Sequence, residues 1–323
     1  MEKQENNIQS IQFLRGIAAF SVLLLHTNLF ANGWMGVELF FIISGFIIPY
    51  SMYNKNYRVS DFGSFFIKRI SRIEPPYIVS IAMVLLLNYS TTWSSWYKGP
   101  AFVVDWRNVL GHLGYLNAFT NQPWLNVAYW TLAIEFEYYL ILALAYPLIV
   151  NKNKLILMAS FFILLATTFI AVPGRHIIVY FPFFLMGIAL FLFKIQKIKF
   201  IEYLIMTTIA QAVCFYKHGP TLFVVAIATL LCIYYIKKVP KPFLLLGTIS
   251  YSLYLTHNVM VSRFMALSAR YVQYVNINVV YIACVLFCLL IAWLFYIAVE
   301  RPFINLSKKI KFHHKRKSVA EVI

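Results

Sequence analysis

Apolar runs of membrane-spanning length recur along most of the chain, and short polar or basic segments separate them. Each run is close to the roughly 20 residues that an α-helix needs to cross a ~30 Å hydrocarbon core. The pattern predicts ten transmembrane helices, over residues 11–31, 35–53, 75–92, 128–150, 154–172, 176–194, 200–216, 220–236, 243–265 and 276–300. We therefore expect an all-α, polytopic membrane bundle in residues 1–306 and a basic cytoplasmic tail in residues 307–323.

Composition agrees with a protein whose solvent is the bilayer. The chain is 61% hydrophobic and only 12% charged, whereas soluble domains carry about 25% charged residues. The first run could pass for the core of a signal peptide, but no small-residue cleavage site follows it, so we expect a retained span. The four cysteines all lie inside apolar runs without metal-ligand spacing, and we expect no metal.

Basic residues fix the predicted orientation. With ten spans both termini lie on one side, and most of the 28 Lys and Arg residues fall on that side. This is the bias of a cytoplasmic face, so we expect both termini in the cytoplasm and attribute the net charge of +17 to topology rather than nucleic-acid binding. The basic residues of the opposite side are Lys98, Arg107, Arg175, Lys217, Arg263 and Arg270.

One further apolar segment, residues 101–119, competes as a span. It carries polar residues that are costly in lipid, including Asp105 and His112, and counting it would spoil the charge bias. We expect residues 93–127 to form an outer loop, too aromatic for disorder. Its tryptophans are Trp93, Trp96, Trp106 and Trp124.

The first span carries Arg15 near its cytoplasmic end and His26 eleven residues further on. Eleven residues make about three helical turns, so the two side chains share one face, roughly 16 Å apart along the axis. Ionisable groups inside a membrane mark functional sites, because each costs about 2.5–3.5 kcal/mol on insertion scales. We expect both to face one groove. The alternative is a packing histidine beside an arginine that reaches the headgroups.

The fourth span holds two carboxylates, Glu135 and Glu137, about 200° apart around the helix, so only one can face the bundle interior. Glu135 lies near the predicted depth of His26. We assign Glu135 as the carboxylate that orients His26 and raises its basicity. A role for Glu137, and a purely structural Glu135 bonded to tyrosines, stay open.

Other polar residues reach the outer half of the membrane. Tyr254 and His257 share one face of the ninth span, where catalytic and structural roles for His257 are equally open. Glu38 lies at the outer rim of the second span. In that span we expect Ser44 and Gly45 to allow close helix packing, and we favour this role for Ser44 over that of a nucleophile.

Near the cytoplasmic surface, Arg69 and Arg72 lie on one helical face beside Lys68. Arginine matches phosphate oxygens well, but spacing alone favours an ordinary basic cytoplasmic loop. Glu300 and Arg301 precede Pro302, and we expect a local ion pair and the end of the tenth span there.

Together these segments resemble the acyltransferase-3 family of bacterial membrane acyltransferases, especially exopolysaccharide and lipopolysaccharide O-acetyltransferases. The likeness runs from about Gln9 to Phe303. It rests on Gln12–Ala19 with His26, on Gly36–Phe46, on Phe66–Tyr77, on Trp130–Glu135, and on Tyr251–His257 with Glu300–Pro302. The chain departs from the family in Glu38, where many members have Asp, and in Phe136-Glu137.

The resemblance implies an acyl-CoA donor, usually acetyl-CoA, entering from the cytoplasm, and a surface glycan or lipid-linked saccharide as acceptor. It places the donor phosphates on Arg69 and Arg72, with Lys68, and the family's Arg–His pair on Arg15 and His26. We expect a protein of the bacterial cytoplasmic membrane that contacts lipids and, as further partners, polysaccharide-synthesis proteins.

The hypothesis for catalysis has His26 either accept the acyl group or deprotonate a sugar hydroxyl. Acceptor binding is assigned to His257, Tyr254, Trp130 and Glu38. A flippase or exporter of a lipid-linked saccharide is the main alternative, and a scaffold of a polysaccharide-synthesis complex is a second. The acyl group, the glycan and its hydroxyl stay open.

Overall fold

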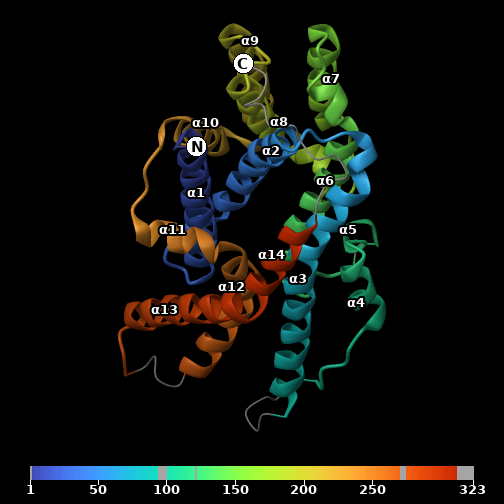
Figure 1. The fold of residues 1–323 in the computed structure, drawn as a ribbon. Helices are drawn as coiled ribbons and strands as arrows, with labels where there is room; N and C mark the ends of the chain where they lie inside the picture. Colours follow the sequence, from blue (N-terminus) through green and yellow to red (C-terminus); the bar gives the residue numbers. More distant parts are fainter. Residues whose placement is uncertain (1, 94–99, 121, 270–273, 311–323) are drawn as a thin grey trace.

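The computed structural model describes residues 2–93, 100–120, 122–269 and 274–310, with side chains from residue 9 onward, and every regular element within them is helical (Figure 1). The all-α fold class is therefore confirmed. The helices are α1 (Glu2–His26), α2 (Gly36–Asn54), α3 (Phe62–Thr92), α4 (Trp106–Leu113), α5 (Asn117–Thr120), α6 (Tyr129–Ile149), α7 (Lys154–Ala166), α8 (Ile177–Lys194), α9 (Phe200–His218), α10 (Pro220–Tyr235), α11 (Lys241–Thr248), α12 (Ser250–Ser268), α13 (Ile277–Phe295) and α14 (Arg301–Lys309), with 3₁₀ turns at Ala31–Met35, Val59–Asp61 and Thr167–Phe169 and a π-helical turn at Tyr296–Glu300.

Five helical segments of the described chain are long and apolar enough to cross a membrane, and each overlaps a predicted span. They are Ala31–Asn54, Val59–Thr92, Tyr129–Ile149, Ile177–Lys194 and Ile277–Lys309. The other five predicted spans fall on α1, α7, α9, α10 and α11–α12, which are shorter or more polar. The total of ten spans and the sides of the termini stay predictions.

The ninth and tenth predicted spans differ from the single helices that the sequence predicts. The ninth, residues 243–265, is two helices, α11 and α12, which separate at Ile249. Gly247 of α11 packs directly on the backbone of Gln12 in α1, and the Gln12 amide donates to Thr248 Oγ1 at 2.9 Å, so this contact holds α11 against α1.

The predicted helix end at Glu300 is wrong. The π turn runs directly into α14, and Pro302 lies in the first turn of α14. Glu300 also does not pair with Arg301, which is exposed; it accepts hydrogen bonds from Ser252 instead. The predicted tail therefore begins within α14, and residues 311–323 lie outside the described part.

Glycines set the closest helix contact, between α2 and α8. A Cβ on Gly45 would collide with the backbone of Phe184, and one on Gly187 with the backbone of Ile42 and Phe46. Small residues at a crossing allow two backbones to approach within van der Waals contact. The packing role expected at Ser44-Gly45 is thus present at Gly45, and it fixes α2 as one wall of the site described below.

The described part of the predicted outer loop, residues 100–120 and 122–127, contains the short helices α4 and α5 and packs against α3, α6 and α12. With eight residues at ~1.5 Å each, α4 is too short to cross a bilayer. Asp105 caps α4 by accepting from the backbone N–H groups of Arg107 and Asn108, at 2.9 and 3.3 Å. Trp93 and Trp106 are exposed, and Trp96 lies outside the described residues.

Candidate active site

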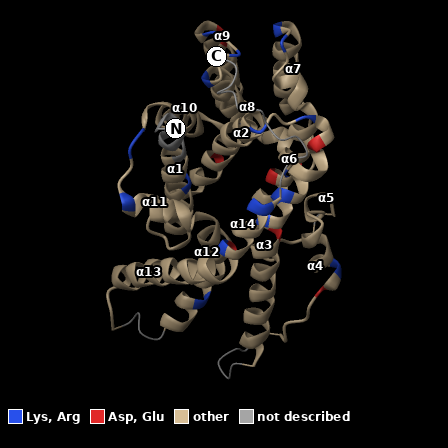
Figure 2. Cartoon of the chain, viewed as in Figure 1, with Lys and Arg blue, Asp and Glu red and all other residues tan. Residues whose placement is uncertain are grey.

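A cavity of about 260 Å³ lies between the N-terminal and central helices. Its walls come from α1, α2, α3, α6 and α12 together with the end of the π turn, and they include members of both large hydrophobic clusters of the fold. Figure 2 shows that charged residues are sparse along most of the ribbon and gather where α14 meets α3, beside this cavity. The polar lining residues are Arg15, Ser44, Ser51, Arg69, Arg72, Thr131, Glu135, Tyr139, Tyr251, Tyr254 and Glu300.

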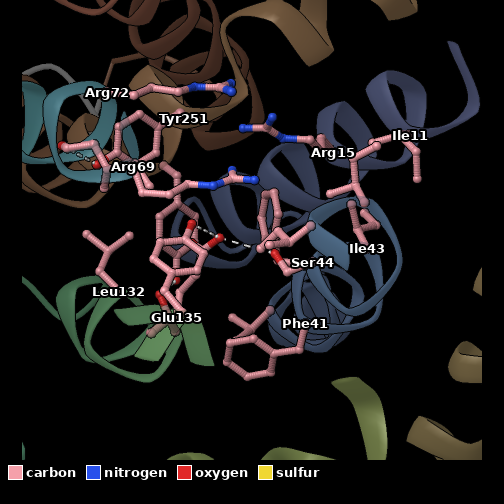
Figure 3. A pocket seen from close by; sticks show the side chains of 18 of the residues that line it. Ile11, Arg15, Phe41, Ile43, Ser44, Arg69, Arg72, Leu132, Glu135 and Tyr251 are labelled. Atoms are coloured by element: carbon pink, nitrogen blue, oxygen red, sulfur yellow. Dashed lines mark hydrogen bonds between the residues drawn. The ribbon is translucent and has the colours of Figure 1, made fainter. Parts of the chain in front are cut away.

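Three guanidinium groups, those of Arg15, Arg69 and Arg72, extend toward one another across the cavity (Figure 3). Arg15 comes from α1, and the other two lie one turn apart on α3. Arg69 lies 5.5 Å from the ring centroids of both Phe65 and Tyr139. None of the three forms a hydrogen bond or ion pair with any other described residue. Half-buried cations without a partner are costly, so this arrangement favours an anionic ligand.

The two carboxylates of the cavity, in contrast, have protein partners. Glu135 Oε1 accepts from Tyr139 Oη at 2.6 Å and from Ser44 Oγ at 3.2 Å (Figure 3). Glu300, only 3% exposed, accepts from the hydroxyl and the backbone N–H of Ser252 at 2.6 and 3.2 Å. The carboxylates are thereby held at the walls and do not neutralise the guanidinium groups by direct contact.

A second cavity, of about 120 Å³, adjoins the first and shares Ser51, Arg69 and Arg72 with it. Lys55, Lys68 and Lys308 complete its charged lining, and no acidic residue contributes among the described ones. The Lys68 ammonium donates to the Ile310 carbonyl at 2.9 Å. Burial, with the positive charges of Lys68, Arg69 and Arg72, lowers the pKa of Lys55 to about 8. Such a cationic surface suits several phosphate groups.

The larger cavity ends at a hydrogen bond between α6 and α12. Thr131 Oγ1 donates to the Ala128 carbonyl at 2.9 Å, so the Tyr254 hydroxyl donates to Thr131 at 2.7 Å. Phe40 packs edge-on against the Tyr254 ring, with centroids 5.5 Å apart. This layer, formed by Phe40, Thr131 and Tyr254, is called the closing layer below.

His26 and His257 do not line the cavity and lie beyond the closing layer. Their ring centroids are 5.0 Å apart, and the His257 ring also contacts that of Tyr254 at 5.8 Å. His26 is half-buried, whereas His257 is 1% exposed. The continuous groove expected from Arg15 to His26 is therefore interrupted in this structure, because the Tyr254–Thr131 contact lies between them.

Glu135 bonds to Tyr139 and Ser44 in the structure, and not to His26 as predicted. Tyr139 follows Glu135 by one helical turn and Ser44 faces it from α2, and both bonds hold the carboxylate inside the cavity. Glu137 points elsewhere, accepting from the Ile177 backbone N–H at 2.8 Å and contacting His176 Nδ1 at 3.2 Å. The two carboxylates thus face different surroundings, as their angular separation requires.

Trp130 and Glu38 lie near the cavity but not on its wall. Trp130 packs against Phe41, a cavity residue, and the Arg175 guanidinium lies 4.4 Å from its ring centroid. Glu38 is buried, and its Oε2 has no hydrogen-bond partner among the described residues. Sequence reasoning also missed residues that the structure adds to the two cavities: Ser51, Lys55, Tyr139, Tyr251 and Lys308. Two of them carried a usable sequence signal: Tyr139 follows Glu135 by one turn, and Tyr251 begins a segment on which the family resemblance rests.

An all-helical membrane fold around a cation-lined cavity agrees with the family comparison. The model of the acyltransferase-3 family, an acyltransferase domain, matches residues 8–297, which is most of the chain. The chain belongs to this family.

Its curated relatives include the O-acetyltransferase OatA of Staphylococcus aureus, from strain NCTC 8325 / PS 47, strain COL and strain MRSA252. Each is 26% identical over 152 residues, which cover 44% of this chain and 25% of the relative. The match thus spans about a quarter of the length of these relatives. No solved structure matches the chain.

Proposed function

We propose that this protein transfers an acyl group, most simply acetyl, from cytoplasmic acyl-CoA to a hydroxyl of a cell-surface polysaccharide or its lipid-linked precursor. The proposal places the chain in the bacterial cytoplasmic membrane, among other polysaccharide-synthesis proteins. The observation that carries it is the set of three cavity-facing guanidinium groups that have no hydrogen-bond or ion-pair partner among the described residues, next to the basic second cavity. Membership of an acyltransferase family and the likeness to O-acetyltransferases support the reaction type.

In this proposal the second cavity binds the phosphates of the donor. Lys55, Lys68 and Lys308 surround one side, and Arg69 and Arg72 reach from the shared wall into both cavities. The larger cavity then takes the narrow acyl-bearing arm, which runs past Arg15 toward the closing layer. The apolar side chains of its wall, among them Ile43, Ile47 and Leu132, suit an uncharged thioester arm better than a sugar.

His26 is proposed as the general base of the transfer. It takes the proton of the acceptor hydroxyl while the hydroxyl oxygen forms a bond to the thioester carbonyl carbon. The carbon–sulfur bond then breaks, and His26 returns the proton to the leaving thiolate, so that no other reactant is needed. The thioester reaches His26 only when the Tyr254–Thr131 bond opens.

The test uses the full chain purified in lipid nanodiscs, with acetyl-CoA radiolabelled in the acetyl group and a panel of envelope oligosaccharides. We expect label on an oligosaccharide with the wild type and none with His26→Ala. A flippase or exporter of lipid-linked saccharides would leave every oligosaccharide unlabelled while moving the lipid-linked form across a vesicle membrane. That outcome would overturn the proposal.

A further inference from the structure

The His257 imidazole has one ring nitrogen fixed and the other unused. Its Nδ1 lies 2.9 Å from the Tyr254 carbonyl and 3.1 Å from the Leu253 carbonyl. Because a carbonyl oxygen only accepts, Nδ1 carries the hydrogen, and in the neutral ring Nε2 is left with a lone pair. Nε2 is buried and has no hydrogen-bond partner among the described residues.

A second buried histidine shows how a purely structural imidazole looks in this fold. His112 also donates from Nδ1 to a carbonyl, that of Asn108, at 2.8 Å. Its Nε2, however, accepts from the backbone N–H of Leu125 at 3.0 Å. Native structures rarely leave a buried polar atom unpaired, so the difference between His112 and His257 requires a reason.

The residue that can use this lone pair is His26. Its ring lies 5.0 Å from that of His257, centroid to centroid, and comes from a different helix. An imidazole acting as a base at one nitrogen needs an acceptor for the N–H at its other nitrogen, which fixes the tautomer and stabilises the imidazolium. Glu135 is bonded to Ser44 and Tyr139, and no carboxylate of the described residues bonds to His26.

We propose that His257 positions His26, by accepting a hydrogen bond from the His26 ring N–H at Nε2 whenever His26 acts as a base or nucleophile through its other nitrogen. The inference rests on the proposed function and replaces the predicted Glu135 by a neutral imidazole. Two backbone carbonyls hold the His257 ring in the required tautomer, and a small rotation of His26 brings the rings into hydrogen-bond contact. No proton leaves the pair in this step, since His257 only accepts the bond.

Two substitutions at the same position test the proposal. His257→Phe keeps a ring of similar size but removes the acceptor, and we expect kcat to fall by about a hundredfold, the lower end of the contribution of a positioned proton-transfer group. The KM for acetyl-CoA should stay within about twofold, because His257 does not line the donor cavity. His257→Gln offers a carbonyl oxygen in place of Nε2 and should recover at least a tenth of the wild-type kcat.

The matched control is His112→Phe, which removes an equally buried imidazole without touching the pair. Measured on folded protein only, it should keep the wild-type kcat. An unchanged kcat in His257→Phe would overturn the inference, and so would a loss that His257→Gln does not relieve while both variants stay folded.

A second measurement separates this inference from the proposed function, because it needs no acyl donor. Diethylpyrocarbonate acylates unprotonated imidazoles, and mass spectrometry of the digested protein gives the rate at His26. A hydrogen bond to His257 makes His26 more nucleophilic, so His257→Phe should slow this modification several-fold, with His176 as internal reference. An unchanged His26 rate would overturn the positioning role even if acetyl transfer is established. If acetyl transfer fails while His26 slows, only the proposed reaction is wrong.

Discussion

The arginine-lined cavity and the segment between α3 and α6 both bury polar side chains, but these side chains differ in how fully they are paired. In the segment, Asn108, His112 and Asn117 bond to one another and to nearby backbone, at 2.6 Å for the Asn117–Asn108 contact. In the cavity, Arg15, Arg69 and Arg72 have no such partners in the described chain. A network in which nearly every polar atom is paired, here all but Asn117 Oδ1, stabilises one conformation, whereas cations without protein partners favour the binding of an anionic ligand. Burial alone therefore does not separate structural from functional polar groups; pairing does.

This comparison predicts the largest effect at Arg69. Arg69→Ala should raise the KM for acetyl-CoA about 10- to 100-fold, because a hydrogen bond to a charged group contributes about 1.5–3 kcal/mol. Its midpoint of thermal unfolding should change little, since only the contacts with the Phe65 and Tyr139 rings are lost. Steady-state kinetics and melting in detergent measure the two. The exposed Arg301→Ala serves as control, and an unchanged KM in Arg69→Ala would contradict a donor site here.

The segment between α3 and α6 should respond in the opposite way. His112→Phe leaves the Leu125 N–H without its partner, which costs about 1–3 kcal/mol, and also removes the imidazole bond to the Asn108 carbonyl. We expect a fall of several degrees in the midpoint of thermal unfolding, with the KM for acetyl-CoA unchanged in the folded protein. A raised KM at full stability would show that the segment takes part in donor binding.

The smallest effect concerns the pH dependence of donor binding. Below its pKa of about 8 the Lys55 amine is charged and attracts phosphate, and above that value the attraction is lost. The affinity for desulfo-coenzyme A, measured by calorimetry, should fall by a few-fold between pH 7 and pH 9, where the phosphates stay ionised. Lys55→Met should flatten this slope, and the exposed Lys152→Met should not. Equal slopes in all three proteins would exclude Lys55 from the site.

Much of the fold follows from the sequence, because apolar runs of fixed length have few solutions in lipid. All ten predicted spans fall on helices. The break at Ile249 and the π turn before α14 were not predictable, since both depend on tertiary contacts, of Gly247 with α1 and of Glu300 with Ser252. Hydropathy reports none of these contacts.

The candidate site was predictable where a charge interrupts an apolar run. Arg15 and Glu135 are of this kind, and both line the cavity. Lys55 and Lys308 were not identifiable, because every cytoplasmic lysine of a membrane protein looks alike in sequence. The contacts of Glu135 and His26 could not be predicted from the sequence either. Helix periodicity shows on which face a residue lies, but not which helix packs against that face.

Besides its place in the proposed reaction, the bond between Tyr254 and Thr131 bears on the permeability of the membrane. A membrane enzyme that hands a group from one compartment to the other risks becoming a leak for ions. With this hydroxyl pair joined, the arginine-lined cavity does not extend to the two imidazoles. Under the proposed function, this separation keeps the proton gradient across the membrane intact between turnovers.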